Sequence, residues 1–190
     1  MRKVFLITIL TMNLYSTGVK AAEYIIDIKG AHASINFKVN HLGYSWLTGR
    51  FDKFDGTFSY DPKNVNGSKI SVNIDTTSIN SNHAERDKHL KGKDFLDVSK
   101  FSTANFTSTS VRELSNGHVA IEGVLSLHGI KKNISIQAQK IGEGKDPWGG
   151  YRAGFSGTSK ISLKDFGINY DLGPASTYVD LEIHIEGVRQ

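Results

Sequence analysis

The chain has 190 residues, of which 38% are hydrophobic and 22% charged, and it contains no cysteine. This length accommodates one domain or a small pair, and the composition is that of a globular protein rather than a disordered chain. The missing cysteines exclude disulfides, thiolate zinc sites, iron–sulfur clusters and cysteine nucleophiles. The formal net charge of +4 would suit nucleic-acid binding only if the basic residues belong to the folded domain.

The first segment is typical of a secretory signal peptide. Arg2 and Lys3 precede an uncharged run of 16 residues, Val4–Val19. Small residues at the −3 and −1 positions place the expected cleavage before Ala22, so residues 1–21 form the signal peptide. The run is shorter than the roughly 20 apolar residues that a membrane-spanning helix needs. An uncleaved membrane anchor is the alternative interpretation.

Cleavage would remove most of the excess positive charge. Arg2, Lys3 and Lys20 are three of the 23 basic residues, and the same segment has no acidic residue. The mature chain therefore has 20 basic and 19 acidic residues, a net charge of +1. This balance removes the electrostatic basis for nucleic-acid binding. Residues 22–190 contain no Pro/Ser-rich linker, and we expect them to form a single domain.

Alternation of apolar and polar residues dominates the mature chain, and a period of two is typical of strands with one buried face. The expected strands span residues 24–29, 34–39, 50–60, 70–75, 101–112, 118–128, 134–139, 151–164 and 179–186. Turn signals separate several of them, namely Asp61-Pro62, Asn66-Gly67, Asn116-Gly117, His128-Gly129 and Asp146-Pro147. The pattern predicts an all-β antiparallel sandwich or barrel of about eight strands.

One segment predicts a helix instead of a strand. Asn82 and Glu85 have the spacing of a capping box, helix-forming residues continue to Lys91, and Gly92 ends the run. We therefore expect a short helix over about residues 82–91. A lone short helix in an all-β chain usually covers an open barrel end or a sheet edge.

The predicted helix also brings titratable side chains together. His83 and Asp87 share one face, as do Glu85 and His89. A solvated, ion-paired face is the simplest interpretation, and a ligand contact at a barrel mouth or a metal site are the alternatives. His-x-Glu at 83–85 matches half of the zinc-deaminase signature, but that chemistry needs cysteine ligands that the chain lacks. No metal site and no cofactor are predicted.

The sequence lacks the usual motifs of nucleophilic catalysis and of dinucleotide binding. Residues 154–157 have the wrong spacing for a nucleophile elbow, and residues 142–144 lack the third glycine of a dinucleotide fingerprint. Asp52 and Asp55 are neighbouring carboxylates in an expected loop or hairpin, which is weak support for a glycosidase. No catalytic residue is therefore predicted, and we expect the protein not to be an enzyme.

The small and aromatic residues of the expected strands determine whether the barrel interior is filled. Aromatic residues gather at positions 37–60 and 148–166, where core packing is the simplest explanation. The small residues Ala104, Gly123, Ala138, Ala153 and Gly157 would leave volume unfilled wherever they point inward. An eight-stranded barrel is either filled by its side chains or holds one small ligand, and these residues leave both states open.

Seven runs occur in a recognisable order: Gly30–Ile35, His41–Trp46, Gly49–Phe51, Asn82–Leu90, Lys93–Asp97, Leu125–Gly129 and Asp146–Gly150. Together they resemble the YceI family of bacterial polyisoprenoid-binding proteins, over the whole of residues 22–190. The resemblance implies an extended, lipocalin-like eight-stranded antiparallel β-barrel with a short helix. It also implies a periplasmic, non-enzymatic binding or carrier protein whose apolar pore holds a polyprenyl phosphate or an isoprenoid quinone.

The resemblance, with the position of these residues in the chain, suggests candidate site residues. The expected apolar pore lining consists of Phe37, Val39, Trp46, Phe106 and Phe155. A polar head group would stay at the mouth, where the cost of burial is avoided. The basic residues that could meet it there are Arg50, Arg86, His89 and Arg152. An ion pair within the protein, such as Arg86 with Asp94, is the alternative role for each.

Two other functions are alternatives to isoprenoid binding. A periplasmic hydrolase acting on an envelope lipid or glycan would use His41, Asp87 or His89 at the mouth. An interaction module would meet a membrane partner through an exposed strand edge or through the basic turn at Lys131-Lys132. The expected partners are an isoprenoid lipid and, transiently, a membrane, with no nucleic acid.

Overall fold

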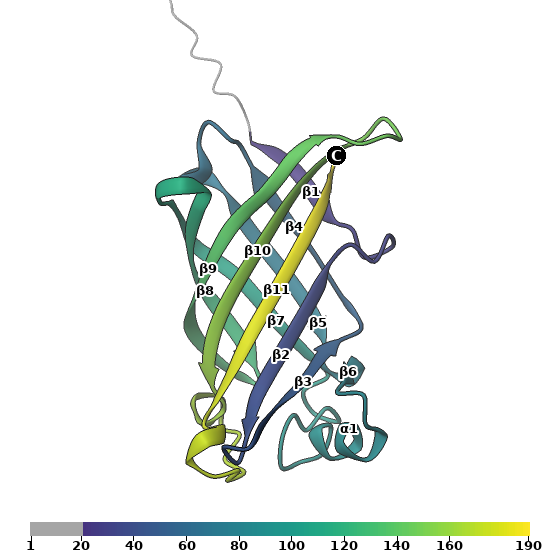
Figure 1. Cartoon of the computed structure of the whole chain (residues 1–190), viewed down its shortest axis with the longest axis vertical. Coiled ribbons are helices and arrows are strands. Elements are labelled where there is room, and N and C mark those ends of the chain that lie inside the picture. The colour runs from purple at the N-terminus through teal and green to yellow at the C-terminus, as the bar shows by residue number, and fades with distance from the viewer. Residues whose placement is uncertain (1–20) are drawn as a thin grey trace, which may run out of the picture.

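The computed structural model describes residues 21–190 and shows an elongated β-barrel (Figure 1). The predicted signal peptide, residues 1–21, lies outside the described residues except for Ala21. No helix within residues 21–190 is long and apolar enough to cross a membrane. The strands are β1 (Ala22–Ile26), β2 (Ser34–His41), β3 (Ser45–Phe51), β4 (Phe54–Tyr60), β5 (Lys69–Asp75), β6 (Ile79–Asn80), β7 (Thr103–Glu113), β8 (His118–Leu127), β9 (Ile130–Lys145), β10 (Tyr151–Ser162) and β11 (Tyr178–Arg189).

Eight of these strands close the barrel, in the order β1-β4-β5-β7-β8-β9-β10-β11, with β11 pairing back to β1. All of these pairings are antiparallel. Each of the five predicted turns lies between two strands that are consecutive in the chain. The predicted all-β antiparallel barrel with one α-helix is therefore confirmed.

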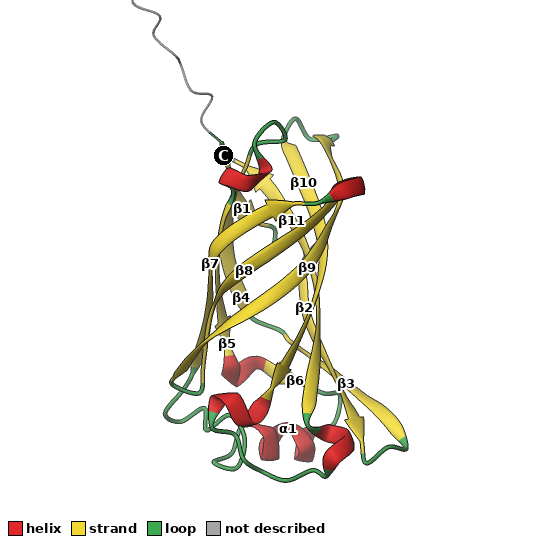
Figure 2. Ribbon diagram, turned by 90° about the vertical axis from the view of Figure 1, so that its left-hand side faces the viewer, coloured by secondary structure: helices red, strands yellow, loops and turns green. Residues whose placement is uncertain are grey.

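The remaining strands, β2, β3 and β6, form an arm at one end of the barrel. β11 pairs with β1 over residues 187–189 and with β2 over residues 179–184, so two short strands share one long partner. A hairpin leads from β2 into β3, and β3 pairs with β6 through Arg50 and Phe51. Figure 2 shows this hairpin projecting from the barrel wall at the end where the helix lies.

The segment 50–60, predicted as one strand, instead belongs to two. β3 ends at Phe51 and β4 begins at Phe54. The backbone N–H of Asp52 donates to the Ser78 carbonyl at 3.1 Å, and the N–H of Lys53 donates to the Ser78 hydroxyl at 2.9 Å. These bonds replace the strand ladder for two residues, so that the chain can pass from the arm into the barrel.

The helix α1 (Ala84–Leu90) lies within the predicted range, at the lower end of the barrel in Figure 1. Its N-cap is His83, whose Nδ1 accepts the backbone N–H of Arg86 at 3.2 Å. Asn82 has a φ of 60° rather than the extended backbone of an N-cap residue. The predicted capping box, which began at Asn82, is therefore wrong by one residue.

Aromatic residues fill the barrel at the end opposite α1. The rings of Tyr24 and Phe58 stack at 4.9 Å, and Phe155 packs edge-on against Phe58 and Tyr60. The backbone of Gly187 crosses this group so closely that an added Cβ would lie 2.4 Å from the Phe58 ring. Beyond these rings, toward α1, the interior is largely aliphatic and is not filled.

Candidate ligand-binding cavity

Two adjoining cavities occupy the barrel interior. The inner cavity has a volume of about 150 Å³, and the mouth cavity, which reaches α1, has a volume of about 630 Å³. Ile35, Ile74, Leu125 and Leu181 line both cavities, so one apolar wall runs from one to the other. The mouth cavity falls within the size range of small-molecule sites, roughly 300–1,000 Å³.

No charged side chain lines the inner cavity within the described part of the chain. Ser59, Tyr60, Ser68 and Ser156 are its only polar residues in the described part of the chain, and the Ser156 hydroxyl lies 3.1 Å from the exposed His184 ring. Burial raises the pKa of the Tyr60 phenol, so this group stays neutral at physiological pH. The inner cavity therefore suits an apolar ligand and would penalise a charged group.

Small residues keep the interior open at some positions but not at others. Ala138 and Gly157 line the inner cavity, and Ala104 lines the mouth cavity. Gly123 opens no volume, because the Phe106 ring occupies the space that a side chain would take, 2.4 Å from an added Cβ. The unfilled volume thus depends on cross-strand neighbours as well as on residue size.

The rim of the mouth cavity is polar. Arg86 and His89 contribute to it from α1, and the His89 ring packs edge-on against Tyr170 at 5.5 Å. Arg86 Nε donates to the Ser81 hydroxyl at 2.8 Å, and its Nη2 donates to the Ser81 carbonyl at 2.6 Å. These bonds hold a guanidinium at the rim. The cavity therefore changes from an apolar interior to a charged rim, where Arg86 supplies a fixed guanidinium and Asp171 a carboxylate.

Four of the five predicted lining residues face the cavities. Phe106 and Phe155 line the inner cavity, and Phe37 and Val39 line the mouth cavity. Trp46 lines neither, because it lies on the outward face of the arm and is 56% exposed. The Lys38 ammonium lies 5.0 Å from the centre of its ring. The predicted position of Trp46 inside the pore is therefore wrong.

The four predicted head-group residues do not gather at one mouth. Arg86 and His89 line the mouth cavity. Arg50 lies on the outer surface, where its Nε donates to Asp52 Oδ1 at 2.7 Å. The hydrogen bond from Asn80 and the Arg50 guanidinium together lower the pKa of Asp52. Since Arg152 lies near the opposite end of the barrel, only two of the four residues share the rim.

Arg152 is surrounded by carboxylates. Its Nη1 lies 2.5 Å from Asp27 Oδ2 and 2.6 Å from Glu186 Oε1, and its Nε lies 2.9 Å from Asp146 Oδ2. The hydrogen bond from Arg152 is the main cause that lowers the pKa of Asp27 to about 2. The same carboxylates raise the pKa of Arg152. Arg152 therefore joins the β1–β2 connection to β11 and to the β9–β10 hairpin.

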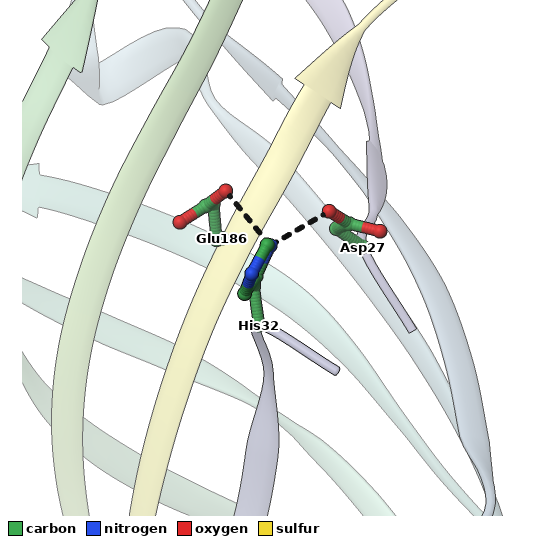
Figure 3. A group of neighbouring side chains, drawn as sticks. All are labelled: Asp27, His32 and Glu186. Carbon is green, nitrogen blue, oxygen red and sulfur yellow. Dashed lines mark hydrogen bonds and ion pairs between the residues drawn. The ribbon is translucent and has the colours of Figure 1, made fainter. Parts of the chain in front are cut away.

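His32 adds a titratable group to this cluster, as Figure 3 shows. Its Nδ1 lies 3.1 Å from Asp27 Oδ2 and 3.4 Å from Glu186 Oε1. The three side chains offer ligand atoms that lie within 4.8 Å of one another, a spacing compatible with a metal ion. A cation would nevertheless have to displace the Arg152 guanidinium from both carboxylates, so the geometry fits an ion-pair network better.

The three residues suggested for hydrolysis do not form one site. His41 and His89 line the mouth cavity. Asp87 is not among the lining residues, and its Oδ1 accepts the backbone N–H of Ser81 at 2.7 Å and the Ser81 hydroxyl. His89 Nε2 lies 3.6 Å from Asp94 Oδ2, which is longer than a hydrogen bond. No two of these three side chains are hydrogen-bonded to each other, so they do not form the base–nucleophile pair of nucleophilic catalysis.

The family model of the YceI-like domain matches residues 26–187 of this chain. The chain belongs to the YceI-like domain family. The family assignment made from the sequence runs is thus confirmed, and the matched YceI-like region includes both cavities and the barrel strands apart from most of β1 and the end of β11.

Curated relatives and solved structures cover nearly the whole YceI-like domain. A UPF0312 protein of Vibrio cholerae is 61% identical over 170 residues, which cover 90% of this chain and 89% of the relative. The Campylobacter jejuni YCEI protein is similar in structure, with a TM-score of 0.73 and 25% identity over 97% of this chain and 99% of that one. A polyisoprenoid binding domain from Saccharophagus degradans shares the fold, with a TM-score of 0.64 and 18% identity over 90% and 99% of the two chains.

Proposed function

We propose that this protein binds a long isoprenoid lipid in the barrel and acts without catalysis as a binding or carrier protein in the periplasm. The ligand would be a polyprenyl phosphate or an isoprenoid quinone. The continuous apolar wall of the inner and mouth cavities is the observation that carries the proposal. The polyisoprenoid binding domain among the structural neighbours supports the same class of ligand.

The energetics favour a prenyl tail in the interior. Each CH₂ group removed from water contributes about 0.8 kcal/mol, so a tail of about twenty carbons has roughly 16 kcal/mol of gross transfer free energy. Association and ordering cost about 4–15 kcal/mol. The gross transfer free energy of a prenyl tail therefore exceeds this cost, and a shorter apolar molecule gains less.

The rim fixes the orientation of the ligand. A phosphate or quinone head would lose its hydration in the inner cavity without gaining charged partners. At the rim it would meet Arg86, whose guanidinium the Ser81 contacts hold in place, and His89. The tail therefore points into the barrel and the head stays beside α1.

A lipid-extraction experiment tests this function. The chain is expressed with its N-terminal segment, purified under native conditions and extracted with solvent, and the extract is analysed by mass spectrometry. We expect a prenyl lipid in the extract, and we expect the stripped protein to bind a polyprenyl phosphate or an isoprenoid quinone. The proposal fails if the extract holds no lipid and the stripped protein binds neither probe.

A matched pair of variants locates the binding site. Ala138 is buried and lines the inner cavity, whereas its neighbour Gln139 on β9 is exposed on the outer face. Ala138→Phe places a ring in the cavity and should weaken lipid binding about tenfold or more, since several buried methylenes are displaced. Gln139→Phe should bind like the wild type. Ala104→Phe makes the same test in the mouth cavity if Ala138→Phe does not fold.

The proposed compartment depends on the N-terminal segment. Its basic start, short apolar run and small residues before Ala22 support export by a cleavable signal peptide. Cell fractionation should place the protein in the periplasm, and its intact mass should be that of a chain beginning at Ala22. A full-length protein retained in the cytoplasm would refute this part of the proposal.

A further inference from the structure

The tip of the β2–β3 hairpin has an unusual turn. Leu42 and Gly43 occupy its centre with φ values of 53° and 84°, and the Tyr44 N–H donates to the His41 carbonyl at 2.9 Å. A hairpin turn with positive φ at both central positions normally has Asn-Gly or Asp-Gly. A branched side chain in this backbone region is strained, so the requirements of the turn do not explain why leucine is present.

The side chain of Leu42 contributes to the mouth cavity. It lines the mouth cavity and is also 51% exposed, so it reaches from the cavity to the outer surface. Strained residues that turn geometry does not require are often found at functional positions. Leu42 therefore connects the hairpin tip with the mouth cavity.

The tip also exposes two aromatic residues. Tyr44 is 87% exposed and Trp46 is 56% exposed. Residues 39–49 contain no Asp, Glu, Lys or Arg, and the fixed charge beside the tip is the Lys38 ammonium, 5.0 Å from the centre of the Trp46 ring. An ammonium at this position can stay among the lipid head groups while the rings enter the layer below them. Tyrosine and tryptophan combine an apolar ring with a polar tip, and both are enriched where membranes meet water. Figure 2 shows the hairpin projecting at the same end of the barrel as α1.

We propose that Leu42, Tyr44 and Trp46 form a membrane-docking tip that enters the interfacial layer of a lipid bilayer. The inference rests on the proposed function, because a carrier must exchange its lipid with a membrane. Leu42 belongs both to the tip and to the lining of the mouth cavity. Docking thus places the mouth against the bilayer, and an isoprenoid passes between them along an apolar path.

The two tryptophans of the chain provide a built-in test. Trp46 is in the proposed tip, whereas Trp148 is 78% exposed in the β9–β10 hairpin at the opposite end of the barrel. Trp148→Phe and Trp46→Phe each leave one reporter. On adding vesicles of phosphatidylethanolamine and phosphatidylglycerol with brominated acyl chains, the fluorescence of Trp46 should shift to the blue and be quenched. The fluorescence of Trp148 should not change.

Substitutions in the tip test the same idea by vesicle partitioning. Tyr44→Ser and Leu42→Asn should each lower the partition coefficient about tenfold, because each removes an apolar group from the interface. Asparagine suits the Leu42 backbone, so this variant keeps the turn. Ile141→Ser is the matched control, since Ile141 is 71% exposed on β9 at the opposite end of the barrel. It should partition like the wild type.

The lipid extracted from each preparation separates the two proposals. Quenching of Trp46 but not Trp148 supports docking. An extract without lipid, together with a stripped protein that binds neither probe, refutes the proposed function alone. A protein that carries lipid but shows no quenching of Trp46, or equal quenching of both tryptophans, overturns docking alone. A dimer in sedimentation that Tyr44→Ser dissociates, without quenching by vesicles, would overturn docking in favour of self-association.

Discussion

Replacing Asp27 by asparagine should destabilise the barrel in a way that depends on pH. Asp27 has a pKa of about 2 in the folded chain instead of the ordinary 3.8, mainly because Arg152 donates a hydrogen bond to it and secondly because the Gly30 N–H does. One pKa unit corresponds to 1.36 kcal/mol, so the ionised Asp27 contributes about 2 kcal/mol to the free energy of unfolding at neutral pH. Its side chain is only 11% exposed, so solvent screens this contribution little.

The sign of the pH dependence follows from the lowered pKa. The contribution is complete above the unfolded pKa of about 4, and it is lost as the pH falls through the folded value of about 2. Urea unfolding of the wild type and Asp27→Asn should therefore show a gap of about 2 kcal/mol at pH 7 and about half of that near pH 3. An equal gap at both pH values would refute an ionic origin.

A second aspartate serves as the control for this measurement. The carboxylate of Asp55 accepts a hydrogen bond from the Asn73 amide at 2.9 Å rather than from a cation. Asp55→Asn should lie within about 1 kcal/mol of the wild type at pH 7, since it exchanges one exposed hydrogen bond for another. A loss as large as that of Asp27→Asn would show that the removal of any surface carboxylate has this effect.

Three further predictions concern packing and capping, and urea unfolding measures each. Gly187→Ala should cost about 1–3 kcal/mol because its Cβ would meet the Phe58 ring, whereas Gly142→Ala, which has nothing within 4 Å, should change stability by less than about 0.5 kcal/mol. Phe166→Ala should cost about 3–5 kcal/mol because this side chain is fully buried, and a loss below 1 kcal/mol would contradict its place in the core. His83→Ala should cost about 1 kcal/mol through the lost N-cap, and His83→Asn should restore it.

Most barrel strands could be predicted from local alternation. A strand with one buried face shows a period of two within a few residues, so the pattern located β5, β8 and β11 to within three residues at each end. The hairpin between β2 and β3 was not predicted. Its central pair, Leu42-Gly43, is not a usual pair for a turn with two positive φ values, so the sequence carried no recognisable turn signal.

The cavity could be predicted only in part. Alternation assigns the residues of a strand to two faces. It does not predict which face points into the barrel or which side chains of the neighbouring strands lie against that face. Phe37 and Trp46 are both aromatic residues of the arm, yet only Phe37 lines the interior, because Trp46 lies on the outward face of β3 while its neighbour Leu47 lines the mouth cavity. Gly123 is small but opens no space, since the Phe106 ring from the neighbouring strand fills it.

By itself the sequence determined the all-β class, the place of the single helix and the family, because these depend on local patterns and on the order of short runs. Only the tertiary structure decided which arginine stands at the mouth and which is held by carboxylates. Arg86 contacts Ser81, five residues away, whereas Arg152 meets Asp27 across 125 residues of chain. The contact between Arg152 and Asp27 forms because the barrel closes and its strands pair in one register. Neither closure nor register can be predicted from a local sequence pattern.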